Sequence, residues 1–170
     1  MRNLILILSI ILLSSSLHAA TFTLQSFSFE DWEKMNVMFT CDGKDISPEL
    51  HWKNPPKNTA SFVLIVSDPD ATRGIFYHWV LFNISKSATN LPENVSSLPE
   101  GTITALNSFE KPLYNGPCPP KGSSEHRYIF NLYALNSKLK LQEDVNAENI
   151  MDAMKNHILD VAELNAKFGR

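Results

Sequence analysis

The sequence has 170 residues and a formal charge of −3, with 44% hydrophobic and 19% charged residues. This balance excludes a disordered or fibrous chain, and the lack of a basic excess argues against a general nucleic-acid-binding protein. About 150 residues follow a candidate leader, which is enough for one domain with a substantial core and too few for two.

The first nineteen residues have the pattern of a signal peptide. Arg2 supplies the positive start, an apolar run covers Leu4 to Leu13, and small residues stand at Ala19 and Ala20. The apolar run is too short to span a bilayer, which requires roughly 20 residues. We therefore expect residues 1–19 to be removed, which takes the formal charge to −4. Residues 20–170 are then a single soluble domain in a bacterial periplasm or the medium.

The middle of the chain is predicted to form short strands separated by turns. The runs "SFVLIVSD", "IFYHWVLFNI" and "HRYIFNLYAL" are apolar on both faces, as in inner strands of a covered sheet. "TFTLQSFSF" and "LHW" are two further candidate strands. The segment 90–125 is rich in Pro, Ser, Asn and Gly, which predicts a long loop, and long loops in compact domains are often functional.

The C-terminal region changes to a helical period. Asn146 is a candidate N-cap, and apolar residues then recur in steps of three and four. The stripe consists of Ile150, Met154, Ile158, Val161, Leu164 and Phe168. The predicted fold is therefore mainly β, a β-sandwich with Greek-key-like strands and a C-terminal amphipathic helix.

Ionisable residues stand at the ends of the predicted inner strands. His78 lies inside an apolar run, and burial of an ionisable group requires a partner or a function. Strand alternation predicts that His78 shares a face with Phe76, Val80 and Phe82. The same rule groups His126 with Tyr128 and Phe130, and Asp68 and Asp70 follow the run before His78. Each residue taken alone has an ordinary structural explanation, such as a turn aspartate or a satisfied core histidine.

Several blocks of the sequence resemble the phosphatidylethanolamine-binding proteins, in particular their bacterial Raf-kinase-inhibitor-like branch. These blocks are "FTCDGKDISPELHW", "SDPDA", "YHWVLFNI", "NSFEKPLYNGPCPPKG" and "HRYIFNLYAL". The resemblance implies a β-sandwich with a small anion-binding pocket formed by Asp68, His78, His126 and Tyr128. It places Asp70, Tyr114, Cys118 and Pro119 at the rim, and gives Arg127 a bracing role.

The two cysteines, Cys41 and Cys118, are expected to form a disulfide. An even number of cysteines in an oxidising compartment makes a disulfide the default. The resemblance adds that both cysteines flank the same pocket.

The main functional hypothesis is a binding module without a cofactor, not an enzyme, that holds a small anion or a phosphorylated headgroup. The resemblance also suggests a protein partner such as a kinase or protease, and membrane contact only through lipid headgroups. One alternative is a thiol hydrolase that uses Cys118 as nucleophile and His126 as base. Another is a metal site of His78, His126 and a carboxylate, joined by His51 if the fold brings it close.

Overall fold

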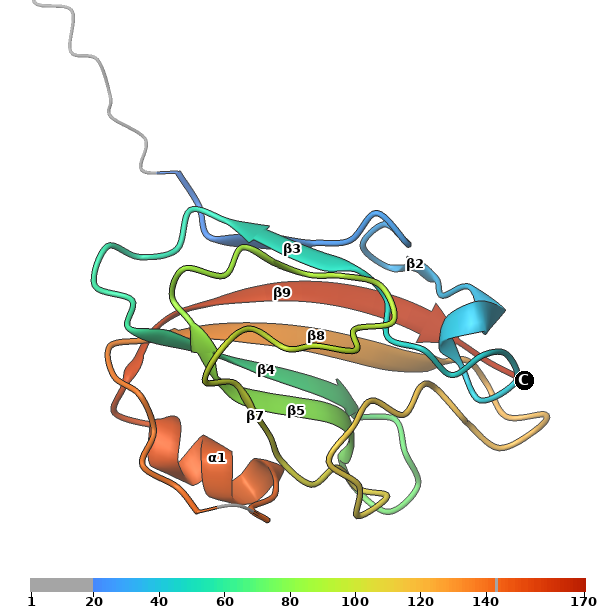
Figure 1. Ribbon diagram of the computed structural model, residues 1–170. Coiled ribbons are helices and arrows are strands. Elements are labelled where there is room, and N and C mark those ends of the chain that lie inside the picture. The colour runs from blue at the N-terminus through green and yellow to red at the C-terminus, as the bar shows by residue number, and fades with distance from the viewer. Residues whose placement is uncertain (1–19, 143) are drawn as a thin grey trace, which may run out of the picture.

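The computed structural model describes residues 20–142 and 144–170, so the predicted signal peptide lies outside the described residues. Two sheets face each other (Figure 1). The smaller sheet has the order β1-β3-β6, and the larger has the order β2-β9-β8-β4-β5-β7. The smaller contains β1 (Thr23–Gln25), β3 (Leu50–Lys53) and β6 (Asn90–Leu91). The larger contains β2 (Glu33–Lys34), β4 (Ser61–Asp68), β5 (Phe76–Ser85), β7 (Ile103–Thr104), β8 (His126–Leu135) and β9 (Ile158–Phe168).

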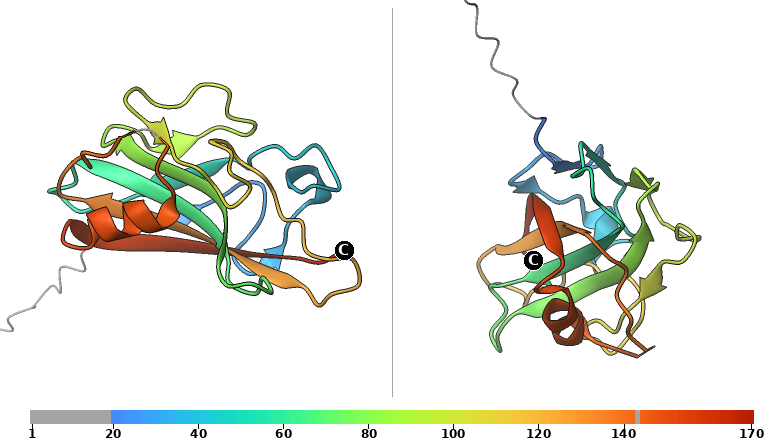
Figure 2. Two further views of the ribbon diagram at one scale, coloured as in Figure 1. Left: turned by 90° about the horizontal axis from the view of Figure 1, so that it is seen from below. Right: turned by 90° about the vertical axis from the view of Figure 1, so that its left-hand side faces the viewer.

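The centre of the larger sheet is antiparallel, with β4 between β5 and β8, and β9 paired along the length of β8. Asp68 at the end of β4 pairs with Phe76 at the start of β5, and His126 at the start of β8 pairs with Phe168. The β4–β5 and β8–β9 pairs therefore bring these strand ends to the same end of the larger sheet. The C-terminus lies at this end in Figures 1 and 2.

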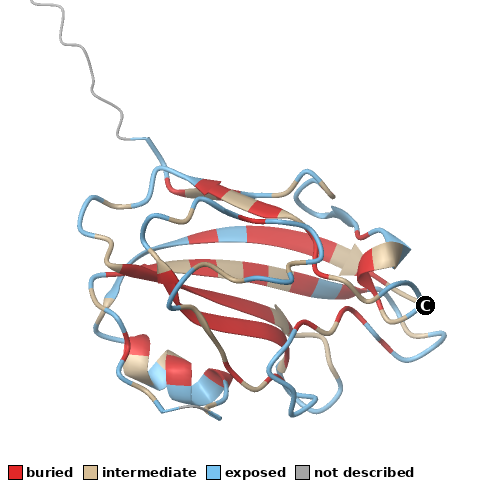
Figure 3. Cartoon of the chain, in the orientation of Figure 1, coloured by how far each residue is buried: buried red, intermediate tan, exposed pale blue. Residues whose placement is uncertain are grey.

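The larger sheet is covered on both faces, as the doubly apolar runs predicted (Figure 3). One core cluster lies between the two sheets and includes Trp52, Phe62 and Tyr128. The other includes Val63 and Phe82 and packs under the helix α1 (Ala147–Met154). The structure thus confirms the mainly β sandwich. A short 3-10 helix, η1 (Val37–Phe39), precedes β3. No helix in the described ranges is long and apolar enough to cross a membrane.

The C-terminal helix is shorter than predicted. It begins after Asn146, whose side chain caps the helix by accepting from the Asn149 backbone, but it ends at Met154. The prediction that the helix continues to Phe168 was wrong, because residues 158–168 form β9. Pairing with the whole of β8 satisfies the backbone of this segment, and that tertiary pairing outweighs its helical spacing.

Candidate functional site

A β-bulge positions His78. Val66 of β4 pairs with Trp79, whereas the next residue, Ser67, pairs with Tyr77, so His78 is an extra residue without a partner in β4. A bulge changes which face the following side chains occupy. His78 therefore lies with Trp79 on the side facing the other sheet. The predicted shared face with Val80 and Phe82 was wrong, because both belong to the cluster under α1.

The His78 ring is buried and held by the loop before β8. Its Nδ1 lies 2.8 Å from the carbonyl oxygen of Asn115, and the Asn115 N–H donates to the His78 carbonyl at 3.1 Å. Burial lowers the pKa of His78 below its ordinary value, while the Asn115 carbonyl and the charge of Asp68 oppose this shift. The uncharged imidazole is the favoured form near neutral pH.

Asp68 and His126 form a buried pair. Asp68 Oδ2 lies 2.7 Å from His126 Nδ1, and the two residues are 4% and 6% exposed. The other carboxylate oxygen of Asp68 accepts the Asp70 N–H at 2.8 Å, which fixes its orientation after the strand ends. A carboxylate against one ring nitrogen orients the imidazole and compensates a positive charge on it.

Asp70 and Arg127 brace this pair from the outside. The Asp70 carboxylate accepts from Arg127 Nε at 2.8 Å, Nη2 at 2.7 Å and the backbone N–H at 2.9 Å. These hydrogen bonds lower the pKa of Asp70 to about 2. Because both of its oxygens face Arg127, Asp70 braces the site and does not offer a free carboxylate to a ligand. Glu125 is exposed and lies near Lys34.

Tyr128 completes the cluster from β8. Its ring is fully buried and meets the His78 ring edge to face at 5.3 Å between centroids. Its hydroxyl has no hydrogen-bond partner within residues 20–142 and 144–170. Burial and the nearby charge of Asp68 raise the pKa of Tyr128, which keeps the hydroxyl protonated. The structure thus brings Asp68, His78, His126 and Tyr128 together, with a buried donor that lacks an acceptor.

Tyr114 and Cys118 flank Asn115 in the loop that contacts His78, and Cys41 is joined to this loop. The Tyr114 hydroxyl donates to the Phe39 carbonyl at 2.7 Å, so it serves the fold and is not free for a ligand. Cys41 and Cys118 form the predicted disulfide, with their Cα atoms 5.4 Å apart. Cys118 is therefore not a free thiol, which removes the nucleophile of the hydrolase alternative. Pro119 is buried in the same loop.

Two residues that sequence reasoning missed hold the loop against His78. Asp45 accepts from the Gly116 N–H at 2.6 Å and lies 3.5 Å from the Asn115 amide nitrogen. A Cβ at position 116 would stand 2.0 Å from the Phe39 carbonyl oxygen, so only glycine fits there. Asp45 and Asn115 both lie in sequence blocks that resemble the family. Their contact joins positions 70 residues apart, which the blocks themselves do not record.

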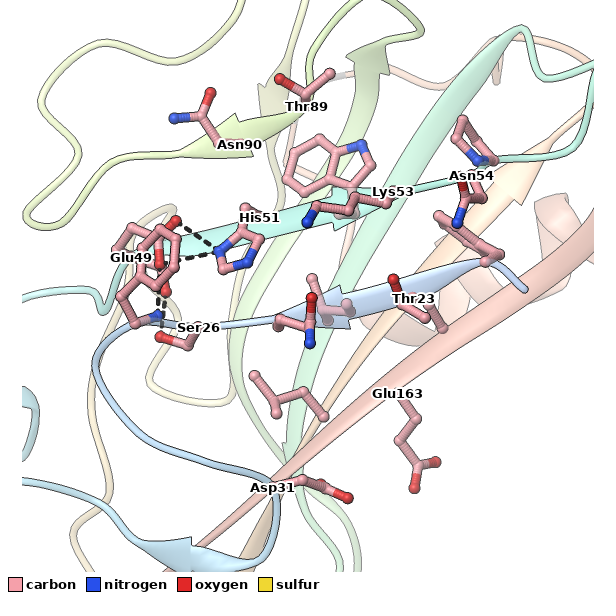
Figure 4. Close-up of a pocket in the computed structure, with 18 of the residues that line it drawn as sticks. Thr23, Ser26, Asp31, Glu49, His51, Lys53, Asn54, Thr89, Asn90 and Glu163 are labelled. Carbon is pink, nitrogen blue, oxygen red and sulfur yellow. Dashed lines mark hydrogen bonds and ion pairs between the residues drawn. The ribbon is translucent and has the colours of Figure 1, made fainter. Parts of the chain in front are cut away.

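A separate groove of about 1180 Å³ lies along β1, β3 and β9 (Figure 4). His51 lines it, held by Glu49 at 3.0 Å and stacked on the exposed Phe27 ring at 4.3 Å. No residue of the Asp68 cluster lines this groove, so His51 does not join that cluster. Among the residues that the structure describes, no group of three His, Cys, Asp or Glu side chains is arranged to hold a metal ion.

Comparison with known proteins identifies the family. The model of the phosphatidylethanolamine-binding protein family matches residues 25–169. A protein of Methanothermobacter thermautotrophicus named UPF0098 is 40% identical over 150 residues, which cover 86% of this chain and 98% of that protein. Another UPF0098 protein, from Aquifex aeolicus, is 39% identical over 148 residues, covering 85% and 86% of the two chains.

Two solved structures share the fold. A phosphatidylethanolamine-binding protein homologue from Chlamydia trachomatis superposes with a TM-score of 0.81 at 34% identity, covering 88% of this chain and 97% of its own. YbcL of Escherichia coli, described as a new member of the mammalian family, has a TM-score of 0.84 at 28% identity, with coverage of 89% and 99%. The chain belongs to the phosphatidylethanolamine-binding protein family, as its motifs predicted.

Proposed function

We propose that this chain is an exported binding protein, not an enzyme, whose Asp68, His78, His126 and Tyr128 cluster holds a phosphate-like anion or a phosphorylated headgroup. One observation carries the proposal: the buried Tyr128 hydroxyl has no hydrogen-bond partner among the described residues, and the ring that bears it contacts the buried His78 ring. A buried donor without a partner costs about 1 to 3 kcal/mol. An oxyanion is the kind of ligand that supplies an acceptor at such a donor.

The cluster contains a carboxylate, so we expect an anion to bind together with a proton. Asp68 is the carboxylate of the cluster, and its Oδ2 contacts His126 Nδ1. Binding of an anion should therefore be accompanied by proton uptake, and affinity should rise as pH falls through the histidine range. The loop joined by the Cys41–Cys118 disulfide forms the rim, where a protein partner such as a kinase or protease would meet the bound group.

The test is calorimetric titration with inorganic phosphate and with phosphoethanolamine at several pH values. His126→Ala removes the ring that pairs with Asp68 and should lower affinity at least tenfold. His157→Ala is the matched control, because His157 lies in the turn between α1 and β9 and contacts Asn136. Equal affinities of the two variants, or no binding to the unmodified protein, would contradict the proposed site.

A further inference from the structure

The first half of β9 has no neighbouring strand on its outer side. β8 pairs with β9 along its length on one side, whereas β2 covers the other side only at Ala166 and Lys167. The chain before β2 extends this cover to Asn165, whose carbonyl accepts from the Trp32 N–H at 2.8 Å. Residues 158–163 therefore form an edge without a partner strand in the described part of the chain. Extended backbone rises about 3.3 Å per residue, so this open edge is about 20 Å long.

The register shows which backbone groups point to the open edge. Asn165 uses its carbonyl and its N–H on the outer side, where the N–H donates to Asp31 Oδ1 at 2.8 Å. Because backbone direction alternates along a strand, the N–H and carbonyl groups of Glu163 and Val161 also point outward. The Val161 N–H donates to the Asp160 carboxylate at 2.8 Å. The Glu163 N–H and the carbonyls of Glu163 and Val161 form no hydrogen bond within the described ranges.

An apolar groove lies beside this edge. It has a volume of about 1180 Å³ and is lined by β1, β3 and residues 161–164 of β9 (Figure 4). Leu24, Phe29 and Leu164 line the groove, and all three belong to the core cluster between the sheets. The volume exceeds the roughly 300 to 1,000 Å³ of typical small-ligand pockets. A chain segment paired with β9 would direct every second side chain toward this apolar lining.

The charges at the open edge determine which kind of segment can pair there. The carboxylates that line the groove or adjoin it on β9 are those of Glu30, Asp31, Asp160 and Glu163. Lysines line the groove only away from β9, with Lys53 on β3 and Lys86 in the turn after β5 (Figure 4). Pairing with β9 of a second copy would bring like charges together, which is how edge strands avoid self-association. A segment that carries lysine or arginine would instead meet opposite charges.

These carboxylates keep capacity for a ligand. The hydrogen bonds of Asp31, Asp160 and Glu163 within the described residues each use a single carboxylate oxygen, which leaves the second oxygen of each group. Glu163 stands on the face of β9 opposite to the buried Ala162 and Leu164. A basic side chain on a segment paired with β9 can therefore lie beside Glu163, while the neighbouring side chains of that segment face the groove.

We propose that the open edge of β9 and the adjoining groove bind an extended, positively charged peptide segment of a partner protein. The segment adds a strand to the larger sheet along residues 158–163. It accepts from the Glu163 N–H and donates to the carbonyls of Glu163 and Val161. Main-chain hydrogen bonds supply affinity in this binding mode, and alternate side chains supply selectivity. The groove shares no residue with the Asp68 cluster, so the inference does not depend on the proposed anion site.

The direct test uses acetylated, amidated hexapeptides and isothermal calorimetry. Alternating valine and lysine gives the proposed pattern, and alternating valine and glutamate reverses its charge. We expect the lysine peptide to bind about tenfold more tightly than the glutamate peptide at low salt, with a ratio that falls as salt is raised. Equal binding of the two peptides, or no binding of the lysine peptide at millimolar concentration, would overturn the inference.

Methylation of the peptide backbone tests for strand addition. One lysine peptide carries N-methyl groups on all valines and another carries them on all lysines. Only one of these sets of N–H groups can face β9, because backbone direction alternates. We expect one methylated peptide to lose about tenfold or more in affinity and the other to bind like the parent. Equal affinities of the two methylated peptides would contradict pairing with β9.

Two substitutions at one position separate the backbone from the charge. Glu163→Pro removes the outward N–H and leaves the hydrogen bonds between β8 and β9 in place, so affinity should fall about tenfold or more. Glu163→Gln keeps the N–H and removes the charge, so affinity should fall about two- to fivefold. Glu148→Gln removes a carboxylate from α1 and is the matched control. Equal affinities of the three variants would overturn the assignment. If Glu163→Pro does not fold, the two methylated peptides still decide.

Hydrogen exchange and sedimentation identify the position and the occupant. The Glu163 amide should exchange quickly in the free protein and become protected by the lysine peptide, since it then gains an acceptor. An amide of Glu163 that stays unprotected at saturating peptide would place the peptide elsewhere. Sedimentation equilibrium shows whether a second copy occupies the edge. A dimer that Glu163→Pro dissociates would overturn the assignment of a positively charged partner, whereas a monomer that binds the lysine peptide supports it.

Discussion

Two buried tyrosine hydroxyls, those of Tyr114 and Tyr128, differ in what they contact. The Tyr114 hydroxyl donates to the Phe39 carbonyl, whereas the Tyr128 hydroxyl has no partner among the described residues. Removing a hydroxyl that donates a hydrogen bond leaves its acceptor unpaired. Removing a buried hydroxyl without a partner removes the desolvation penalty of that hydroxyl. We therefore expect Tyr114→Phe to lower the free energy of unfolding by about 1 to 2 kcal/mol and Tyr128→Phe to raise it by about 1 kcal/mol.

Urea denaturation of the two variants measures this difference in sign, and phosphate titration gives the second readout. Tyr128→Phe should weaken phosphate binding about tenfold, since it removes one ligand hydrogen bond. A Tyr128→Phe protein that is less stable and binds phosphate normally would show that the hydroxyl serves only the fold.

The Asp70–Arg127 contact makes stability depend on pH. The pKa of Asp70 is lowered from 3.8 to about 2 by hydrogen bonds from Arg127. A carboxyl whose pKa is lower in the folded state stabilises the protein above its unfolded pKa and loses this effect as pH falls. The stability difference between the unmodified protein and Asp70→Asn should be constant from pH 5 to 8 and shrink between pH 4 and 2.

Denaturant unfolding across that pH range tests this prediction, with Arg127→Gln as the matched partner variant. In Arg127→Gln the further change Asp70→Asn should have a smaller effect than in the unmodified protein, because the carboxylate has lost both guanidinium donors and keeps only the backbone N–H of residue 127. A difference that stays constant down to pH 2 would contradict the assigned cause.

The proximity of the candidate site residues could be predicted from the sequence, but their geometry could not. The motif blocks gave Asp68, His78, His126 and Tyr128, and the structure brings them together. The bulge at His78 was missed because it arises from the pairing of β5 with β4, which strand alternation within one segment does not record. The acceptor for its ring, Asn115, comes from a loop 37 residues away.

At the level of elements, the disulfide fixes the loop that contacts His78. It joins Cys41, next to η1, with Cys118, three residues after Asn115, and closes a separation of 77 residues. The chain-entropy model gives about 4 kcal/mol of stabilisation for a loop of this length. We expect reduction to lower the melting temperature markedly and to weaken phosphate binding, because the Asn115 carbonyl loses its anchor.

Thermal unfolding and phosphate titration of oxidised protein, reduced protein and the Cys41→Ser, Cys118→Ser double variant test this. Addition of reductant to the double variant is the control and should change nothing. Equal melting temperatures of the oxidised and reduced proteins would contradict the prediction.

The end of the chain shows why one periodic pattern can mislead. Apolar residues from Ile150 to Phe168 fit a helical stripe, yet only the first part is helical. The second part also alternates, and the buried apolar positions of β9 follow this period of two, while Asn165 between them is also buried. They are Ala162, Leu164, Ala166 and Phe168, of which two are alanines with a weak hydrophobic signal. Their pairing with β8 decides between the two patterns and is not visible in the segment itself.

At the scale of the whole molecule, the first prediction concerns export. The signal-peptide pattern of residues 1–19 predicts a mature protein that begins at Ala20. Intact mass of protein recovered from the periplasm or medium of a bacterial host measures this. A mass that includes Met1 to Leu17 would contradict it, and a substitution of the apolar run by charged residues should keep the chain inside the cell.

The site draws on segments that lie far apart in the sequence. Asp68 and His126 are 58 residues apart, and the disulfide spans 77. The β4–β5 pair is a local hairpin, whereas a long segment separates β8 from its other partner, β4.

This arrangement has a consequence for the order of events during folding. Loop closure over long separations is slow, and all-β chains of this kind fold in milliseconds to seconds. The hairpin of β4 and β5 can form early, but the contact between Asp68 and His126 requires β8 to dock. Anion binding is therefore expected to appear only in the last stage of refolding, which makes it a probe for completion of the larger sheet.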